Sequence, residues 1–447
     1  MSSRRVSLVN SLSKGVRLSV ALSGLLFSTQ SHAQQPKVFR PTPDLDLRAF
    51  TSLIAVGSAA LQAAQLDVEL SDAEVNQARR LENPTADFSW ATIPIGETNP
   101  EGLRSPYANV PSYNVGVSYR FLIGKRGPRT ERAQALRESA QATKESIARQ
   151  QALELVHVLG YWAIATMRKD AASGILEDAR RSVELVKSRA SGGFSTPLDV
   201  DRMEIEQSRV QQVILRSEGE EANERAACSA LLGIACEGFA GTEQARAFLR
   251  TWVDRGFNLP SPDLDRRPDI RALAAQQKAA SAESRYAEAM AIPDPTIRFG
   301  YVHDRFVISG NQQNSLNLSV SVPVPIFDSG QAMRQAAASR ASRYSGQKER
   351  VLASATARIP ALRGSLELAR RRQSTIAGEM LPKARAVLAD VEKAASNRLV
   401  ALTDVIQARR IVHELLVEEA DSLITAFDAS IELLSQVSES ESRGAGQ

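Results

Sequence analysis

The chain contains the same succession of features twice, and this duplication limits its possible folds more than any other property. In each half, a proline-marked boundary precedes an alternating stretch, a second alternating stretch runs into a glycine turn, and an Asp-Val motif interrupts a helical pattern. The matching segments are 83–84 with 293–295, 114–127 with 317–330, and 197–200 with 402–405, at offsets of 211, 203 and 205 residues. Two equivalent units of roughly 200 residues therefore fill most of the chain, and the fold must place both in equivalent surroundings.

The N-terminus has the three parts of a secretory signal. A basic start precedes an apolar run at 18–27 and a Ser-His-Ala cleavage site at 31–33. This segment holds four basic residues and no acid, so the mature chain is about neutral although the whole sequence has a net charge of +4. We therefore expect an exported protein without a nucleic-acid partner.

Each unit is predicted to contain a β-hairpin, at about 85–123 in the first and 295–327 in the second. Residues 113–121 alternate between apolar and polar side chains, and residues 316–322 do the same. This period of two predicts strands with one apolar and one polar face.

Long helical patterns occupy most of the remaining chain. A helix over about 46–81 precedes the first hairpin, and one over 268–291 precedes the second. Helical hairpins follow at about 127–232 and 331–435, with helices of up to about 90 Å. Aromatic residues make up only 5% of the chain, which suits small-residue helix packing. Pro360 lies inside one of these helices and is expected to kink or break it.

The pattern divides the chain into a signal, two repeats and a polar tail. Each repeat comprises a helix, a β-hairpin and a long helical hairpin, and the first ends in a mixed segment. The boundaries are 1–33 for the signal, 34–265 and 266–437 for the repeats, and 438–447 for a disordered tail.

Four amphipathic strands of about ten residues predict a pore shared between several chains. That length suits a tilted span of a bilayer, and the alternation suits a membrane barrel. Lipid tolerates no open sheet edge, and four strands cannot close around a useful lumen. The alternatives are a soluble sheet with one wet face, or an exported periplasmic scaffold or adaptor without a pore.

The sequence resembles the TolC-like outer-membrane efflux proteins. Arg-Pro-Asp-Ile-Arg at 267–271, Pro-Asp-Pro-Thr at 293–296 and Val-Pro-Val-Pro-Ile-Phe-Asp-Ser-Gly at 322–330 are similar to that family's motifs. Leu-Leu-Gly at 231–233 and Leu-Pro at 381–382 also fall where the family has them. The resemblance covers nearly all of residues 40–435.

This resemblance implies a mixed α and membrane-β fold assembled as a homotrimer. Three chains would form a 12-stranded barrel in the outer membrane of a Gram-negative bacterium, and the helical hairpins would form a tunnel in the periplasm. The mixed segments near 34–45, 233–265 and 425–440 would form a belt. The implied function is the passive exit duct of a tripartite efflux system. The partners would be outer-membrane lipid, a periplasmic adaptor of the membrane fusion class and an inner-membrane transporter of the resistance-nodulation-division type.

The resemblance also assigns roles at the periplasmic tips. Asp199 and Asp404 follow the two hairpin turns and would form carboxylate rings that constrict the mouth and favour cations. The alternative is that each is an acid at a helix start, favoured by the helix dipole. The tip residues Pro197, Leu198, Leu402 and Thr403 would dock the adaptor, or else pack the turns.

A second group of candidates lies at the junction between barrel and tunnel. Gly127 and Gly330 mark the two strand-to-helix turns. Lys125 and Arg126 either line the lumen or pair with acids of neighbouring helices. The Gly-Lys-Arg-Gly of 124–127 resembles the heavy-metal efflux branch, while the cargo stays open between metal ions and organic compounds.

The two cysteines, Cys228 and Cys236, are candidates for a disulfide in an oxidising compartment. In an unbroken helix they would lie about 12 Å apart, too far for a bond. Gly233 is expected to end the helix between them, which makes pairing possible. No metal or cofactor site is predicted, because the histidines are scattered and no catalytic motif is present. We therefore expect no enzymatic activity.

Overall fold

The computed structural model describes residues 38–93, 95–96, 104–260, 263–305, 312–397 and 399–437. The predicted signal and polar tail lie outside these residues. All described elements belong to one unit that begins at Val38.

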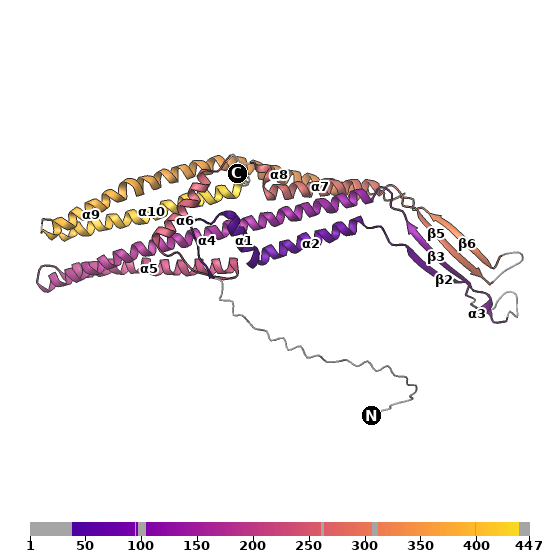
Figure 1. The fold of residues 1–447 in the computed structure, drawn as a ribbon, viewed down its shortest axis with the longest axis horizontal. Helices are drawn as coiled ribbons and strands as arrows, with labels where there is room; N and C mark the ends of the chain where they lie inside the picture. Colours follow the sequence, from indigo (N-terminus) through magenta and orange to yellow (C-terminus); the bar gives the residue numbers. More distant parts are fainter. Residues whose placement is uncertain are drawn as a thin grey trace, which may run out of the picture. The chain divides into compact units, whose positions relative to one another are not determined.

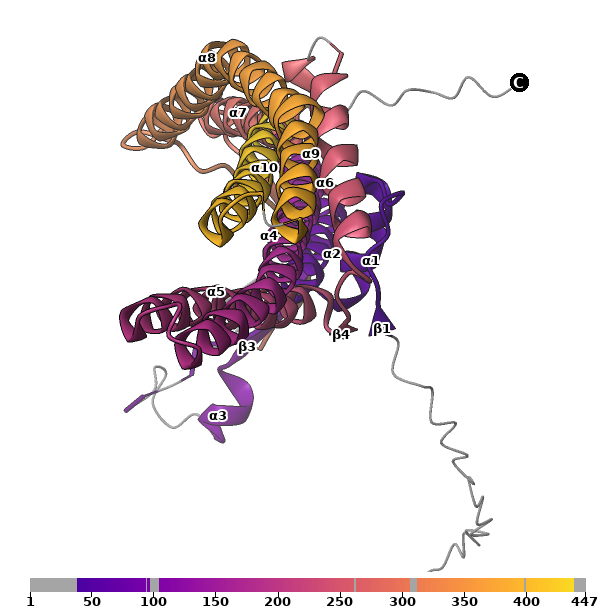
Figure 2. The ribbon, with the colours of Figure 1, turned by 90° about the vertical axis from the view of Figure 1, so that its left-hand side faces the viewer.

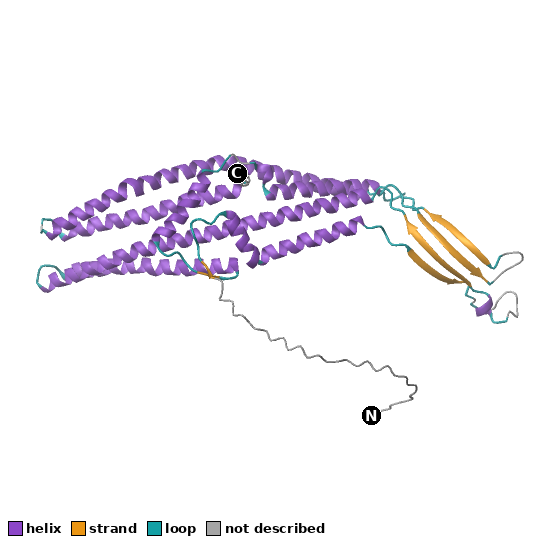
Figure 3. Ribbon diagram, in the orientation of Figure 1, coloured by secondary structure: helices purple, strands orange, loops and turns teal. Residues whose placement is uncertain are grey.

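Four strands form one antiparallel sheet in the order β2-β3-β5-β6 (Figure 3). A short helix, α3 (Pro106–Asn109), lies in the connection of the first hairpin and is not predicted from the sequence pattern. Both predicted hairpins are present, and they pair with each other through β3 and β5. The strands are β2 (Thr85–Ala91), β3 (Ser112–Arg120), β5 (Thr296–Asp304) and β6 (Asn314–Ser321).

The long helices form two helical hairpins, and in the sequence each comes directly after one of the β-hairpins. Figure 2 shows α4 with α5 and α9 with α10 as separate pairs, and Figure 1 shows both turns at the end remote from the sheet. The 66-residue α4 extends about 100 Å. The hairpin helices are α4 (Arg126–Ser191), α5 (Pro197–Leu232), α8 (Gln331–Thr375), a π-helical turn (Ile376–Met380), α9 (Leu381–Ser396) and α10 (Leu402–Gln436).

The prediction of a single helix over 46–81 is wrong, because this segment forms two helices. α1 (Leu47–Gly57) and α2 (Ala59–Arg79) meet at an angle of 82°. Gly57 lies so close to α5 that an added Cβ would be 2.0 Å from the Leu232 carbonyl oxygen. Ser58 then caps α2, because its hydroxyl accepts a hydrogen bond from the Leu61 amide.

The helix does not break at Pro360, because α8 continues through this residue. The Thr356 carbonyl, which loses its helical partner, belongs to an exposed residue and can bond water. The helical pattern instead changes at the π-turn Ile376–Met380, just before Pro382. A proline lacks the amide that continues the ladder, and a wider turn accommodates that loss.

The main hydrophobic core lies where the two repeats meet beside the hairpins. The segments predicted as a belt contribute β1 (Val38–Phe39), which pairs in parallel with β4 (Ala235–Cys236), and α6 (Thr242–Phe257). The aromatic members are Phe39, Phe50, Trp162, Phe248, Trp252 and Phe427, all buried. The remaining described helices are η1 (Leu264–Arg266) and α7 (Pro268–Ala289), and α7 packs against α4 and α8.

Candidate functional site

The sheet has a continuous apolar face that the chain itself leaves exposed. Val117 pairs with Phe299, which in turn pairs with Leu318, so apolar side chains adjoin across three strands. Phe299 is 57% exposed and Leu318 is 70% exposed. The face continues through Phe88, Trp90, Val115, Tyr301, Leu316 and Val320, which are all exposed. A patch of this extent marks a surface that contacts lipid or another protein.

The opposite face of the sheet carries a polar network. The Arg298 guanidinium on β5 reaches across β3 to Asp87 on β2, with an Nη2–Oδ2 distance of 2.6 Å, and also donates to Asn114 Oδ1. A Cβ on Gly116 would lie 2.5 Å from Arg298 Nη2, so glycine is what lets the arginine cross. Arg298, Asp87 and Asn114 therefore form a network on the polar face, and sequence alternation alone did not identify it.

The strand–helix junction is held by a buried ion pair between the two repeats. Lys125 Nζ lies 2.6 Å from Asp294 Oδ2, and the side chains are only 7% and 10% exposed. Lys125 also donates to the Ile292 carbonyl, and Asp294 accepts from the Ile123 amide. Burial alone would raise the pKa of Asp294. The hydrogen bonds from Lys125 and Ile123 and the charge of Lys125 have a larger, opposite effect, so the pKa of Asp294 lies below its ordinary value.

The other junction candidates have separate local roles. Arg126 is exposed and donates to the Arg79 carbonyl at the end of α2. Gly127 lies in the first turn of α4, where an added Cβ would meet nothing within 4 Å. Gly330 caps α8 at φ +83°, and a Cβ there would lie 2.3 Å from the Ala287 carbonyl oxygen. Of these three positions, only Gly330 requires a glycine.

The first hairpin tip is built by a capping box at the start of α5. Thr196 is the N-cap, Pro197 is the first helical residue, and Asp199 is the third. The Asp199 carboxylate accepts from both the amide and the hydroxyl of Thr196. These hydrogen bonds lower the pKa of Asp199. Leu198 is 56% exposed and available to a partner.

The second tip repeats this arrangement in part. Asp404 accepts from the Ala401 amide at 3.0 Å, and alanine at the N-cap supplies no side-chain acceptor. Leu402 and Thr403 begin α10. Both aspartates thus have the helix-start role that the sequence left open, and neither carboxylate is buried. Two further apolar side chains are exposed in the hairpin turns, Phe194 (85%) and Leu399 (76%). Neither was predicted from the sequence, although an apolar residue next to the turn-forming Gly192-Gly193 or Asn397 is a signal for an exposed tip residue.

A cavity of about 560 Å³ lies between the two helical hairpins, behind the tips. Ile175, Val210 and Ile406 contribute apolar walls, while Arg202 and His413 contribute polar edges. Burial lowers the pKa of His413 despite the nearby Glu414 and Glu206 charges. Its Nδ1 has no hydrogen-bond partner among the described residues. The cavity shows that the hairpins are incompletely packed against each other in the single chain.

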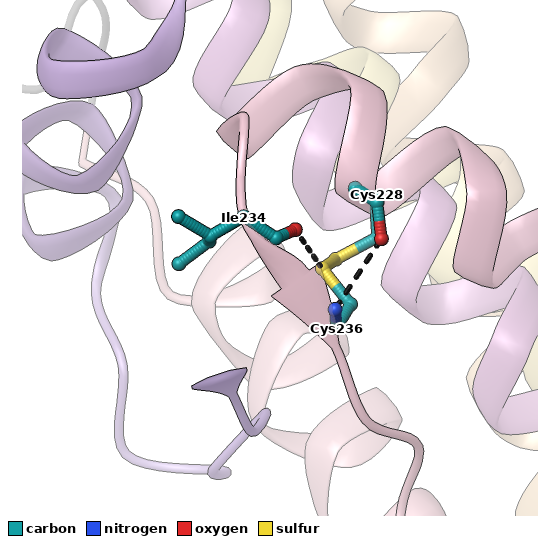
Figure 4. Close-up of a disulfide and its surroundings, with 4 residues drawn as sticks. Cys228, Ile234 and Cys236 are labelled. Atoms are coloured by element: carbon teal, nitrogen blue, oxygen red, sulfur yellow. Dashed lines mark hydrogen bonds between the residues drawn. A yellow bond between two sulfur atoms is a disulfide. The ribbon is translucent and has the colours of Figure 1, made fainter. Parts of the chain in front are cut away.

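Cys228 and Cys236 form a disulfide within the main hydrophobic core (Figure 4). Gly233 ends α5 at φ +68°, which turns the chain so that β4 returns toward the helix. The Cys236 amide donates to Ser229 Oγ at 3.3 Å, and both cysteines are buried. The bond therefore fixes the end of α5 to the strand that pairs with β1.

In the described part of the chain, no three His, Cys, Asp or Glu side chains gather as a metal site. Across the same residues, no single helix has the length and apolar character to cross a membrane. The bent pair α1 and α2 has that length and apolar character only when the two helices are taken together.

Comparison with known proteins relates the chain to outer-membrane channels. The sequence pattern of the "Outer membrane efflux protein" family matches residues 51–234. The cobalt-zinc-cadmium resistance protein CzcC of Cupriavidus metallidurans is 26% identical over 302 residues, which cover 65% of this chain and 67% of that protein. The pyoverdine export outer membrane protein OpmQ of Pseudomonas aeruginosa is 27% identical over 230 residues, 49% of this chain and 47% of that protein.

The fold is similar to solved structures of the same class. The outer membrane protein VceC of Vibrio cholerae superposes with a TM-score of 0.66 at 17% identity, covering 87% of this chain and 95% of that chain. The chain is thus similar to outer membrane efflux proteins over residues 51–234, which are less than half of its length.

Proposed function

We propose that this chain is the exit duct of a tripartite efflux system in the outer membrane of a Gram-negative bacterium. It extends from that membrane into the periplasm and conducts substrates passively. The observation that carries the proposal is the two-faced sheet, whose apolar face is exposed and whose polar face carries the Arg298–Asp87 ion pair. Such a surface suits lipid on one side and a water-filled lumen on the other.

The assembled form proposed here is a homotrimer with a 12-stranded barrel and a periplasmic tunnel of helical hairpins. The unpaired outer strands β2 and β6 support it, because lipid excludes open sheet edges. The proposed partners are outer-membrane lipid around the barrel, a periplasmic adaptor at the tips and a resistance-nodulation-division transporter behind it. The exposed Leu198 and Phe194 favour docking at the tips.

Membrane fractionation of the expressed full-length protein tests the channel proposal. We expect the protein in the outer membrane, and a detergent-extracted particle with the protein mass of three mature chains. A soluble periplasmic monomer would instead mean that the apolar face never contacts lipid. That outcome would favour the alternative, an exported helical scaffold or adaptor without a pore.

We further propose that Asp199 and Asp404 constrict the periplasmic mouth as rings of carboxylates. Asp199→Asn with Asp404→Asn removes the charges but keeps an oxygen that can accept the N-cap amide hydrogen bonds. We expect block of single-channel current by a divalent cation to weaken about tenfold, equivalent to ~1.4 kcal/mol. The matched control is Asp201→Asn, an exposed acid on α5 outside the capping box. Equal block in the double variant and the control would remove the constriction assignment and leave both aspartates as helix caps.

A further inference from the structure

Two glycines adjoin on the polar face of the sheet, and the Arg298 side chain lies over both. Gly116 on β3 pairs with Gly300 on β5, and both residues are buried. In the described part of the chain no helix packs over the sheet, so this burial comes from the sheet's own side chains. An added Cβ at Gly116 would lie 2.5 Å from Arg298 Nη2, and one at Gly300 would lie 3.1 Å from Arg298 Nη1. The guanidinium therefore lies flat against the strands, in the space that two side chains would otherwise occupy.

Asp87 fixes the guanidinium in this position. Arg298 Nε lies 3.1 Å from Asp87 Oδ1, and Arg298 Nη2 lies 2.6 Å from Asp87 Oδ2. Two parallel hydrogen bonds of this kind set both the place and the plane of an arginine. Arg298 Nη2 also donates to Asn114 Oδ1 at 2.8 Å. As a result the Arg298 side chain is 21% exposed, although it lies on an uncovered face.

Arg120, the other arginine of the described strands, is held differently. It ends β3 and donates to Glu82, which precedes β2. Its side chain is 52% exposed, so pairing with an acid does not by itself press an arginine against the sheet. The low exposure of Arg298 depends in addition on the missing side chains at Gly116 and Gly300.

We propose that Asp87 and Gly116 hold the Arg298 guanidinium against the barrel wall, and that without them Arg298 would make the barrel select anions. This inference rests on the proposed channel function and assigns the residues that set its charge selectivity. In the proposed homotrimer the network occurs three times at one level of the barrel. Each guanidinium is there neutralised by a carboxylate, so the wall at this level does not repel cationic solutes.

Released arginines would both narrow and charge the bore. Twelve strands at the usual spacing and tilt enclose a backbone radius of about 12 Å. Inward-pointing side chains fill part of that radius, and three extended arginines would reach furthest into it. A ring of arginines favours anions and disfavours cations. A change that keeps every charge but displaces Arg298 should therefore alter which ions pass.

The alternative is that the pair serves only to join the two β-hairpins. Asp87 belongs to the first hairpin and Arg298 to the second, and the contact crosses β3 between them. In that case its loss would lower the stability of the protein without changing the passage of ions. Charge selectivity therefore distinguishes the two roles, and stability does not.

Gly116→Ala is the sharpest variant, because it displaces the guanidinium without changing any charge. Gly116 does not have the left-handed backbone conformation, so alanine fits its main chain. Asp87→Ala releases Arg298 by another route, and it carries the test if Gly116→Ala fails to assemble. Gly116→Ala with Arg298→Gln removes the charge of the displaced group. The matched control is Ser315→Thr, which also adds a methyl group to the polar face but at an exposed position outside the network.

The readout is block of single-channel current by inorganic tripolyphosphate, with the purified protein in a planar lipid bilayer. The anion is added on the side where the barrel opens. We expect the half-blocking concentration to fall about tenfold in Gly116→Ala and in Asp87→Ala, because three guanidiniums then face the anion. Gly116→Ala with Arg298→Gln should return to wild-type block, and Ser315→Thr should keep it.

Wild-type block in both Gly116→Ala and Asp87→Ala would overturn the inference. The channel proposal would then stand, with the Arg298–Asp87 pair as a structural link between the hairpins. Strong block that persists after Arg298→Gln would also overturn it, because another group would then bind the anion. A wild-type protein that conducts no current would remove the channel proposal itself, and this inference with it.

Discussion

Replacing Lys125 with methionine is expected to destabilise the protein by about 3–5 kcal/mol. Methionine keeps the length of the side chain but leaves the Asp294 carboxylate buried without its cation. The change acts where the two repeats meet, between the end of β3 and the start of β5. Thermal unfolding of the detergent-solubilised protein, followed by the helical circular dichroism signal, measures the loss.

Two further variants separate the ion pair from general effects at the junction. Lys125→Met with Asp294→Asn should recover much of the lost stability, because the amide oxygen can still accept from the Ile123 amide. Arg126→Met, at the exposed neighbouring position, should cost less than about 1 kcal/mol. If the double variant were as unstable as Lys125→Met, the loss would reflect packing of the lysine stem rather than the unpaired charge.

The stability difference between wild type and Lys125→Met is expected to depend on pH, because Lys125 lowers the pKa of Asp294 in the wild type. A carboxyl with a depressed folded pKa stabilises the protein above its ordinary titration range, and this contribution is lost as the pH falls through the folded value. In Lys125→Met, burial without a cation favours the protonated acid. The stability difference between wild type and variant should therefore shrink on acidification.

Repeat periodicity predicted the architecture because each element has a strong local signal. Alternation located all four strands, and Gly192, Gly193 and Pro197 located the first hairpin turn. The second turn, near 397–402, contains no glycine or proline and was placed by its repeat equivalence to the first. What failed were details that depend on tertiary contacts. The bend at Ser58 arises because Gly57 packs against the Leu232 carbonyl, and nothing in the local sequence indicates that approach.

The sequence indicated where some of the candidate residues lie in the fold, but it did not indicate which residues they pair with. Lys125 lies between β3 and α4, but its partner Asp294 is far away in the sequence and lies in a loop rather than a helix. The pair between Arg298 and Asp87 was not recognised, because it spans two strands and needs the absence of a side chain at Gly116. Contacts of this kind depend on strand register, which the chain sets only when both hairpins pair.

The second large effect concerns Trp252, at the centre of the core where the repeats join. Its ring is fully buried, lies 6.0 Å from the Phe50 ring centroid and stacks beneath the Arg255 guanidinium at 4.4 Å. Trp252→Ala should lower the free energy of unfolding by about 3–5 kcal/mol, because it leaves a cavity that Phe50 and the neighbouring helices cannot fill. Urea unfolding of the solubilised protein measures this cost.

Trp252→Phe is the matched control, and it distinguishes loss of volume from loss of polar contacts. The indole Nε1 has no hydrogen-bond partner within the described residues, so phenylalanine sacrifices no bond seen there and keeps most of the aromatic packing. Its cost should be clearly smaller than that of alanine. Because α6 carries Trp252 against α10, while Phe50 comes from α1, the cavity would weaken contacts between both repeats at once. Equal stability of the alanine and phenylalanine variants would mean that this core does not hold the repeats together.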